Sequence, residues 1–220
     1  MEFSHYSVML EECISGLAIR PDSIYVDGTA GGAGHSCQIA KRLTEGKLFA
    51  LDKDPDAVSI AEQRLAPYAQ ATVIQADFKD LCCTLKERGI TGVDGILLDL
   101  GVSSYQLDTA ERGFSYHQDA PLDMRMSKTG PSARDLVNTY SVEDLSRIIR
   151  EFGEEKYAWS IAKNIEKARA KAPILTTGQL AEIIRESMPY SARREKNPAK
   201  KTFQAIRIAV NGELDALSQV

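Results

Sequence analysis

The 220-residue sequence lacks the features of several specialised protein classes. No apolar run approaches the roughly 20 residues of a membrane-spanning helix, so we expect no membrane span. The first residues, Met-Glu-Phe-Ser-His5, contain neither a basic segment nor an apolar one. We therefore predict that there is no signal peptide and that the protein is cytoplasmic. What remains is the composition of an ordinary globular protein, with 43% hydrophobic and 26% charged residues.

Cysteine is also scarce, and acidic residues slightly outnumber Lys and Arg, 31 to 27. None of the four cysteines forms a C-x-x-C pair, so we predict no zinc or other metal site. Cys82 and Cys83 are adjacent, which disfavours a structural disulfide and predicts free thiols in a reducing compartment. The net charge of −4 argues against attraction of nucleic acid over the whole surface.

One glycine-rich stretch organises the chain. The apolar run Ile24–Val26 ends in Asp27, and a helix-compatible run begins at His35. Between them stand Gly28, Gly31, Gly32 and Gly34. A strand, a glycine turn and a helix together are typical of nucleotide-binding α/β proteins. The alternative is a tight turn that needs glycine only to reverse the chain.

The glycine stretch differs from a dinucleotide-binding fingerprint. In the pattern G-x-G-x-x-G, Cys37 stands where the third glycine belongs. Asp27 would repel the pyrophosphate of a dinucleotide but suits a cationic ligand. S-adenosylmethionine (SAM) carries a sulfonium, an ammonium and no phosphate. The sequence therefore favours SAM over a nicotinamide cofactor, and a methyltransferase over a dehydrogenase.

Asp52 ends the second predicted strand, Lys47–Asp52. It follows Gly34 by 18 residues, close to the roughly 20-residue spacing of an acid that holds a ribose. The alternative is a surface acid at the start of the next helix, since Asp54-Pro55 follows. The spacing favours the ribose role.

Two further strands are predicted, and each is followed by a candidate ligand residue. Phe78 follows the strand Thr72–Gln75 and either borders an adenine or belongs to the core. Asp99 follows the apolar run Ile96–Leu98, which is typical of a central parallel strand. Because parallel strands end at one edge of a sheet, we expect Asp52, Phe78 and Asp99 to lie beside the glycine stretch.

The alternation of strands and helices stops after Ser104. Residues 105–129 form a long polar loop, which is usually functional or a lid. Amphipathic helices follow, including one capped by Thr177 and a final packed helix over 203–217. We predict a first domain at 1–104, an inserted subdomain at 105–212 and a return to the first domain at 213–220.

A basic segment lies near the end of the insert. Residues 185–207 contain seven basic and two acidic residues, so the local charge is +5. Such a segment suits contacts with phosphates, although a solvated loop is the commoner outcome for a charge run.

Several motifs together resemble one family, the bacterial methyltransferases that modify N4 of a cytosine in small-subunit (16S) ribosomal RNA. The motifs are His5–Leu10, Asp27–Ser36, Ala50–Pro55, Asp94–Ser104, Glu111–Ser115, Pro121–Met126 and Lys201–Arg207. The likeness covers essentially the whole chain. Family members look longer, and they continue past Val220 into strands that complete the sheet.

The resemblance implies a Rossmann-like, SAM-dependent methyltransferase with a doubly wound, mostly parallel α/β sheet and an inserted all-helical subdomain. It implies small-subunit ribosomal RNA, within the assembled subunit, as partner and the decoding centre as target. The implied SAM contacts are Ala33, Gly34, His35, Asp52, Phe78, Asp99 and Gln106, to which the loop adds Gly31 and Gly32. Asp99 is our candidate acceptor for the amine protons, or it serves SAM only.

The RNA-contacting candidates lie in the insert. Asp123 and Arg125 either orient RNA or pin their own loop. The basic candidates are Arg193, Arg194, Lys200, Lys201 and Arg207. An RNA-binding or ribosome assembly factor without catalysis is the alternative function, and transfer to DNA is a third.

Overall fold

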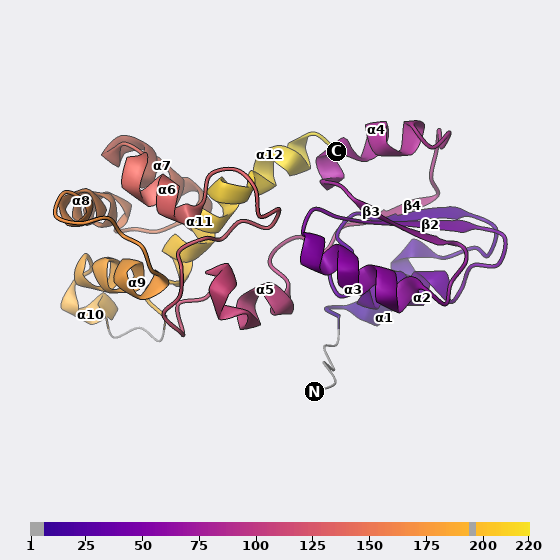
Figure 1. Ribbon diagram of the computed structural model, residues 1–220, viewed down its shortest axis with the longest axis horizontal. Coiled ribbons are helices and arrows are strands. Elements are labelled where there is room, and N and C mark those ends of the chain that lie inside the picture. Colours follow the sequence, from indigo (N-terminus) through magenta and orange to yellow (C-terminus); the bar gives the residue numbers. More distant parts are fainter. Residues whose placement is uncertain (1–6, 194–196) are drawn as a thin grey trace. The chain divides into compact units, whose positions relative to one another are not determined.

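The computed structural model describes residues 7–193 and 197–220, and the chain divides into two compact units (Figure 1). The first unit comprises the chain up to Ser104 together with Asp215–Val220. The second unit comprises Tyr105–Leu214.

A four-stranded parallel sheet forms the centre of the first unit, with the strand order β3-β2-β1-β4. The strands are β1 (Ile24–Asp27), β2 (Lys47–Asp52), β3 (Ala71–Gln75) and β4 (Gly95–Leu97). The helices are α1 (Leu10–Leu17), α2 (Gly34–Ala40), α3 (Pro55–Leu65) and α4 (Leu81–Lys86), with the 3₁₀ turn η1 (Phe78–Asp80). The parallel order and the helical connections confirm the predicted Rossmann-like sheet.

Helices cover both faces of this sheet (Figure 1). Successive strand residues point to opposite faces, so Tyr25 and Val26 belong to different cores. The Tyr25 core includes Leu10, Ile14, Ile39, Leu48, Ala61 and Leu65, from α1, α2, β2 and α3. The Val26 core includes Phe49, Leu51, Ile74, Leu81 and Leu85, from β2, β3 and α4. Two cores on one sheet are the arrangement of a doubly wound fold.

The apolar run Ile96–Leu98 predicted a strand, and in the part of the chain described here β4 pairs with β1 at the edge of the sheet. Ile96 is 42% exposed as a result. An all-apolar run indicates that both faces of a strand are suited to burial, but it does not indicate whether the strand has a neighbour on each side.

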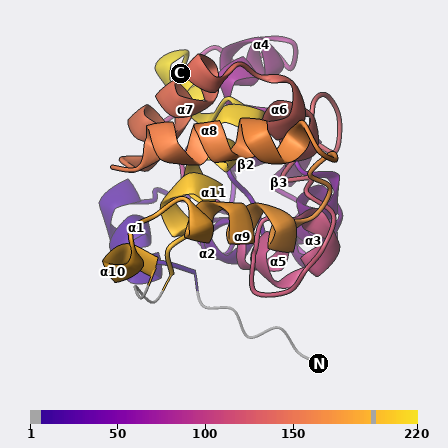
Figure 2. The same cartoon turned by 90° about the vertical axis from the view of Figure 1, so that its left-hand side faces the viewer.

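The second unit is helical. Its helices are α5 (Ser104–Asp108), α6 (Ala133–Thr139), α7 (Val142–Gly153), α8 (Ala158–Arg169), α9 (Thr177–Glu186), α10 (Tyr190–Arg193), α11 (Lys200–Asn211) and α12 (Glu213–Ser218), with the 3₁₀ turn η2 (Ala110–Arg112). The first residue of α5 and the last residues of α12 belong to the first unit. Figure 2 shows α8 and α9 running side by side. Buried aliphatic residues such as Leu145, Ile161 and Leu180 fill the space between these helices. This explains the amphipathic patterns in the sequence.

The N-cap of α9 is Thr176, and the prediction of Thr177 was wrong by one residue. Thr176 Oγ1 accepts from Gln179 N at 3.3 Å, while Gln179 Oε1 accepts from Thr176 N at 3.2 Å. This reciprocal capping box needs a spacing of three residues, which only Thr176 has. Thr177 is instead buried, and its hydroxyl donates to Gln118 O at 3.1 Å.

The predicted final helix is broken at Gly212. Gly212 has φ +60° and ends α11, and α12 starts at the next residue. The break changes the direction of the apolar stripe, so Leu214 and Leu217 are 49% and 41% exposed. The prediction that both pack in one continuous helix is therefore wrong. Within residues 7–193 and 197–220, every helix is too short or too polar to cross a bilayer.

Candidate active site at the carboxyl edge of the sheet

The glycine loop, residues 28–34, is hydrogen-bonded to the strands on both sides of β1. Gly28 N donates to Leu97 O of β4 at 2.9 Å, and Ala30 N donates to Leu51 O of β2 at 2.8 Å. A Cβ on Gly28 would lie 2.5 Å from a methyl group of Leu98. A side chain at 28 would therefore crowd Leu98 and Phe78, and the loop is held between β2 and β4.

Asp27 lies beneath this loop and is fully buried. Its Oδ1 accepts from Thr29 N at 3.1 Å, and its Oδ2 accepts from Ser36 Oγ at 2.6 Å. Burial raises the pKa of Asp27 above its usual range, against the effect of these hydrogen bonds. Asp27 therefore ties the beginning of the loop to the first turn of α2.

Asp52 holds the outer part of the loop. Its Oδ2 accepts from Gly31 N at 2.8 Å, and its Oδ1 accepts from Asp54 N at 2.9 Å. Burial, together with the negative charges of Asp54 and Asp27, raises the pKa of Asp52 to about 6 despite both hydrogen bonds. Each carboxylate oxygen can accept a second hydrogen bond, so Asp52 remains able to hold the hydroxyls of a ribose.

The helix-start alternative applies to Asp54 and not to Asp52. Asp54 is the N-cap of α3, with Oδ1 accepting from Asp56 N at 3.0 Å, and Pro55 occupies the first helical position. Asp52 does not cap the helix, so its carboxylate can serve the glycine loop and a ligand at the edge of the sheet.

The middle of the glycine loop adopts left-handed backbone conformations. Gly31 has φ +51°, and Ala33 has φ +58° and is the N-cap of α2. Gly32 is exposed, so its backbone is open to a ligand. Gly34 lies against Ser7, whose hydroxyl oxygen occupies the position of a Cβ on residue 34.

Among the predicted SAM contacts, the side chains of His35 and Phe78 are buried beside the glycine loop. His35 is buried, and its Nε2 lies 3.1 Å from Val8 O. Phe78 is buried in η1 beside Gly28, as its core alternative required. Both residues stand at the predicted edge of the sheet, and their contact with a cofactor stays a prediction.

Asp99 stands at the end of β4 with an exposed side chain. Its backbone N donates to Thr29 Oγ1 at 2.7 Å, which fixes the chain just beyond the strand. Burial is the main cause of the raised pKa of Asp27, and the negative charge of Asp99 is a second, smaller one. The register, in which Asp27 pairs with Ala50 and Leu97, thus brings Asp52 and Asp99 to opposite sides of the glycine loop.

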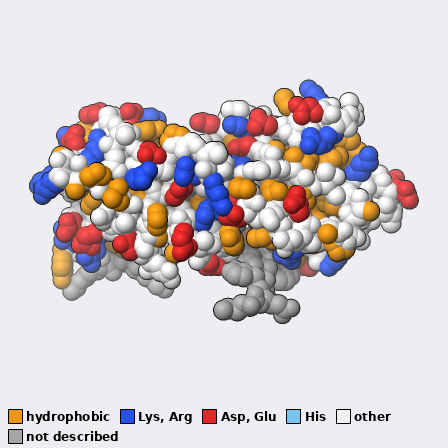
Figure 3. Space-filling view, viewed as in Figure 1, with side chains coloured by type: hydrophobic (Ala, Val, Ile, Leu, Met, Phe, Trp, Pro, Cys, Tyr) orange, Lys and Arg blue, Asp and Glu red, His pale blue; other side chains and the backbone are white. Residues whose placement is uncertain are grey.

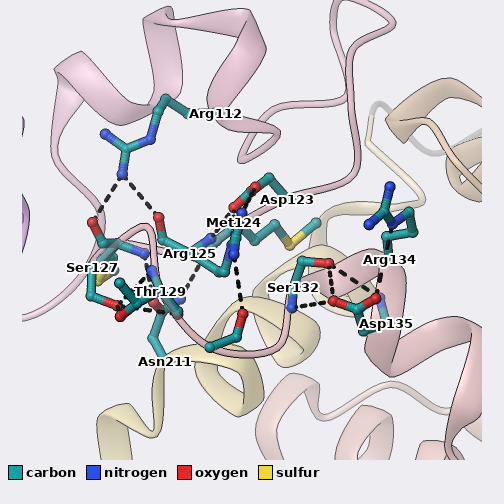
Figure 4. A network of polar contacts seen from close by, with 12 residues as sticks. Arg112, Asp123, Met124, Arg125, Ser127, Thr129, Ser132, Arg134, Asp135 and Asn211 are labelled. Atoms are coloured by element: carbon teal, nitrogen blue, oxygen red, sulfur yellow. Dashed lines mark hydrogen bonds and ion pairs between the residues drawn. The ribbon is translucent and has the colours of Figure 1, made fainter.

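Asp123 and Arg125 of the second unit bind each other (Figure 4). Arg125 Nε and Nη2 donate to Asp123 Oδ1 and Oδ2 at 2.9 and 2.6 Å, and Nη1 donates to Gly130 O at 3.1 Å. Burial alone would raise the pKa of Asp123, but the bonds from Arg125 outweigh it and lower this pKa. These are the contacts expected if the pair pins its own loop. Gln106 is buried in α5 of the same unit.

Arg112 and Asn211 also hold this loop, and neither was singled out from the sequence (Figure 4). Arg112 Nη2 donates to Arg125 O and Met126 O at 2.9 and 3.1 Å. Asn211 Nδ2 donates to Met124 O at 2.7 Å, and its Oδ1 accepts from Met126 N at 2.8 Å. Arg112 lies inside a recognised motif, but the sequence gives no sign that α11 reaches the loop.

Several basic candidates are engaged by the protein itself. Arg207 Nε and Nη2 donate to Glu213 at 2.8 and 2.9 Å, and the side chains are 18% and 16% exposed. Arg193 donates to the carbonyls of Met188 and Glu186 at 2.8 and 2.9 Å, at the end of α9. These two arginines stabilise the helical unit, and their contact with phosphates stays a prediction.

The remaining basic candidates differ among themselves. Lys201 Nζ donates to Glu154 O at 3.1 Å. Lys200 is exposed at the start of α11. Arg194 lies outside the described residues.

Comparisons with known proteins identify similar sequences along the whole chain. The model of the MraW methylase family matches residues 2–220. The chain is 54% identical to "Ribosomal RNA small subunit methyltransferase H 2" of Agathobacter rectalis over 99% of this chain and 71% of that protein. It is 52% identical to "Ribosomal RNA small subunit methyltransferase H" of Brevibacillus brevis, over 100% of this chain and 71% of that protein. The protein of that name from Ruminiclostridium cellulolyticum is 55% identical, over 100% and 72% of the two chains.

Proposed function

Because this chain belongs to the MraW methylase family, we propose that it transfers a methyl group from SAM to the exocyclic N4 of a cytosine in the decoding centre of 16S ribosomal RNA. The substrate class rests on the names of relatives that are 52% to 55% identical. The cytosine nitrogen, the decoding centre and the assembled subunit rest on the motif resemblance. A cytoplasmic location accompanies this function.

The observation that carries the proposal is the placement of Asp52 and Asp99 on either side of the glycine loop. When bound, SAM supplies a methyl group activated by a sulfonium. Asp52 suits its ribose, and the exposed backbone of Gly32 allows close approach. The negative charge of Asp27, Asp52 and Asp99 suits a cationic cofactor and opposes a pyrophosphate.

The target nitrogen needs hydrogen-bond acceptors, because its lone pair is delocalised into the cytosine ring. We assign this role to the Asp99 carboxylate and to backbone carbonyls of residues 100–102. Acceptors aimed at the amino protons make the lone pair available and stabilise the positive charge that develops on nitrogen. As the new N–C bond forms and the C–S bond breaks, Asp99 is placed to receive one amino proton.

RNA recognition is assigned to the inserted helical segment, residues 105–212. Asp123 and Arg125 fix a loop whose shape then helps to position the base, and the motif resemblance adds Gln106 to the predicted SAM contacts. Lys200 and Lys201 at the start of α11, with Arg193, Arg194 and Arg207, complete the set of candidate RNA contacts. The target base must be unstacked to reach the methyl group.

The test uses labelled SAM and small ribosomal subunits that lack the modification, followed by digestion to nucleosides. The expected product is labelled N4-methylcytidine. Label on another nucleoside would overturn the assignment of the nitrogen. RNA binding with SAM bound and no transfer would favour the non-catalytic assembly factor instead.

A further inference from the structure

The outer face of α8 carries an exposed tryptophan among lysines. We define the α8 face as Trp159, Lys163 and Lys167 of α8 together with Lys156 in the turn just before the helix, all of which are exposed. At 100° per residue, Trp159, Lys163 and Lys167 fall within one quarter-turn of the helix. Trp159 is 48% exposed and is the chain's only tryptophan.

The opposite side of α8 is fixed in the second unit. Ala158, Ile161, Ala162 and Ile165 are fully buried. Ser160 Oγ donates to Ser187 O at 2.8 Å, and Asn164 Nδ2 donates to Ser187 Oγ at 2.9 Å. The α8 face is therefore presented on a rigid helix, and Figure 2 shows α8 unobstructed in the foreground.

The charge of this face is positive although the chain is acidic. Lys156 and Lys167 form no ion pair with any residue between 7 and 193 or between 197 and 220. Lys163 Nζ lies 5.4 Å from the ring centroid of Trp159 and 3.7 Å from Glu166, the one acid on this side of the helix. Figure 3 shows acidic and basic side chains mixed over the face it draws, so a local excess of lysine is informative.

We infer that the α8 face is a docking surface for RNA, with Trp159 stacking on an unpaired base and the lysines contacting successive phosphates. A helix rises about 1.5 Å per residue, so Trp159 and Lys167 are roughly 12 Å apart along α8, about three to four steps of a nucleic-acid strand. An exposed aromatic ring beside cations is the combination that binds single-stranded RNA. This inference rests on the proposed function, because it deepens that function by adding a second contact with the ribosomal RNA.

The first measurement follows the fluorescence of Trp159, excited at the red edge of its absorption, while the full chain is titrated with a short single-stranded RNA oligonucleotide. We expect saturable quenching that weakens with salt. Saturable quenching by polyglutamate, without quenching by RNA, would overturn the inference in favour of an acidic protein partner.

The second measurement compares the affinities of variants for deproteinised small-subunit ribosomal RNA by filter binding. Trp159→Ala should weaken binding about tenfold. Replacing the three lysines by alanine should reduce the slope of log K against log salt by about 2, since each phosphate contact contributes roughly 0.7 to 0.9. The matched controls are Tyr140→Ala, an exposed aromatic on the same unit, and alanine at the exposed Lys41, Lys47 and Lys86 of the first unit. These controls should leave the affinity and the salt slope unchanged.

SAM affinity and methyl transfer separate this inference from the proposed function. All variants should bind SAM as the wild type does. If the wild type methylates ribosomal RNA while the α8 variants bind it with unchanged affinity and slope, the inference is wrong and the function stands. If the wild type transfers no methyl group while the α8 variants still lose RNA affinity, the function is wrong and the surface stands.

Discussion

Gly31 donates its backbone N–H to Asp52 Oδ2 at 2.8 Å. The acid that the strand spacing assigned to a ribose therefore also holds the loop that approaches the ligand. Ionisation of this one carboxyl is consequently expected to affect both cofactor binding and folding.

SAM binding should weaken as Asp52 becomes protonated. The pKa of Asp52 is raised to about 6, mainly by burial, so the carboxylate that accepts the ribose hydroxyls is lost as the pH falls below about 6. Isothermal titration of SAM between pH 5 and 8 should show affinity falling on the acid side. Asp52→Asn should bind more weakly at pH 8, by about tenfold, and lose this dependence. Unchanged affinity of the variant at pH 8 would contradict the ribose role.

The stability of the ligand-free protein should show the opposite dependence. The folded-state pKa of about 6 lies above the ordinary 3.8, so between these values the folded protein binds more protons than the unfolded chain. Asp52 therefore lowers the free energy of unfolding as the pH rises through this window, by at most about 3 kcal/mol. Urea denaturation at several pH values measures the effect. The free energy of unfolding of Asp52→Asn minus that of the wild type should therefore increase as the pH rises through this window. Replacement of the exposed Asp22 by Asn should give no such change.

The strands of the first unit could be predicted because each is a short apolar or β-branched run between polar or glycine-containing stretches. The prediction of β2 as Lys47–Asp52 is confirmed residue for residue. Family membership likewise confirms the predicted class, a SAM-dependent methyltransferase. The apolar run Ile96–Leu98 likewise predicted β4, which pairs with β1 in the sheet.

The contacts within the helical unit were the least predictable from sequence. Arg207 looked like part of a basic run, yet it is paired with Glu213, which lies just beyond that run. Asn211 meets Met124 across a separation of 87 residues, and no local pattern marks such a pair. A charge run or an amphipathic pattern predicts the properties of a single segment. These contacts depend instead on how several helices pack together.

Asp99 is predicted to act in methyl transfer beyond any contact with SAM. Its backbone is fixed through Thr29, so Asp99→Asn should preserve the loop while removing the proton acceptor. We expect a fall of at least about 100-fold in kcat with the Kd for SAM changed less than about threefold. Single-turnover transfer and SAM titration on the same preparation measure both. A loss confined to SAM binding would show that Asp99 serves the cofactor alone.

Asn211 is predicted to position the loop from Met124 to Met126. Asn211→Ala leaves two backbone groups of the loop without their partner, which should lower the free energy of unfolding by about 2 to 3 kcal/mol. Asn211→Asp keeps the acceptor for Met126 N but loses the donor to Met124 O, so an intermediate loss is expected. Urea denaturation gives the stabilities. The KM for ribosomal RNA should rise from wild type to Asn211→Asp to Asn211→Ala, while the Kd for SAM stays constant. A change in the Kd for SAM would contradict a role confined to this loop.

Arg207 and Glu213 allow a structural role to be separated from RNA contact. Their two short hydrogen bonds and low exposure predict a coupling of about 1 to 3 kcal/mol in a double-mutant cycle with alanine. Exchanging the two residues, Arg207→Glu with Glu213→Arg, should recover much of the stability lost in Arg207→Glu alone. If Arg207 acts only within the fold, the exchanged protein also recovers its affinity for ribosomal RNA, because the local net charge is unchanged. If stability returns while RNA affinity stays low, the guanidinium at residue 207 contacts phosphate as the sequence predicted.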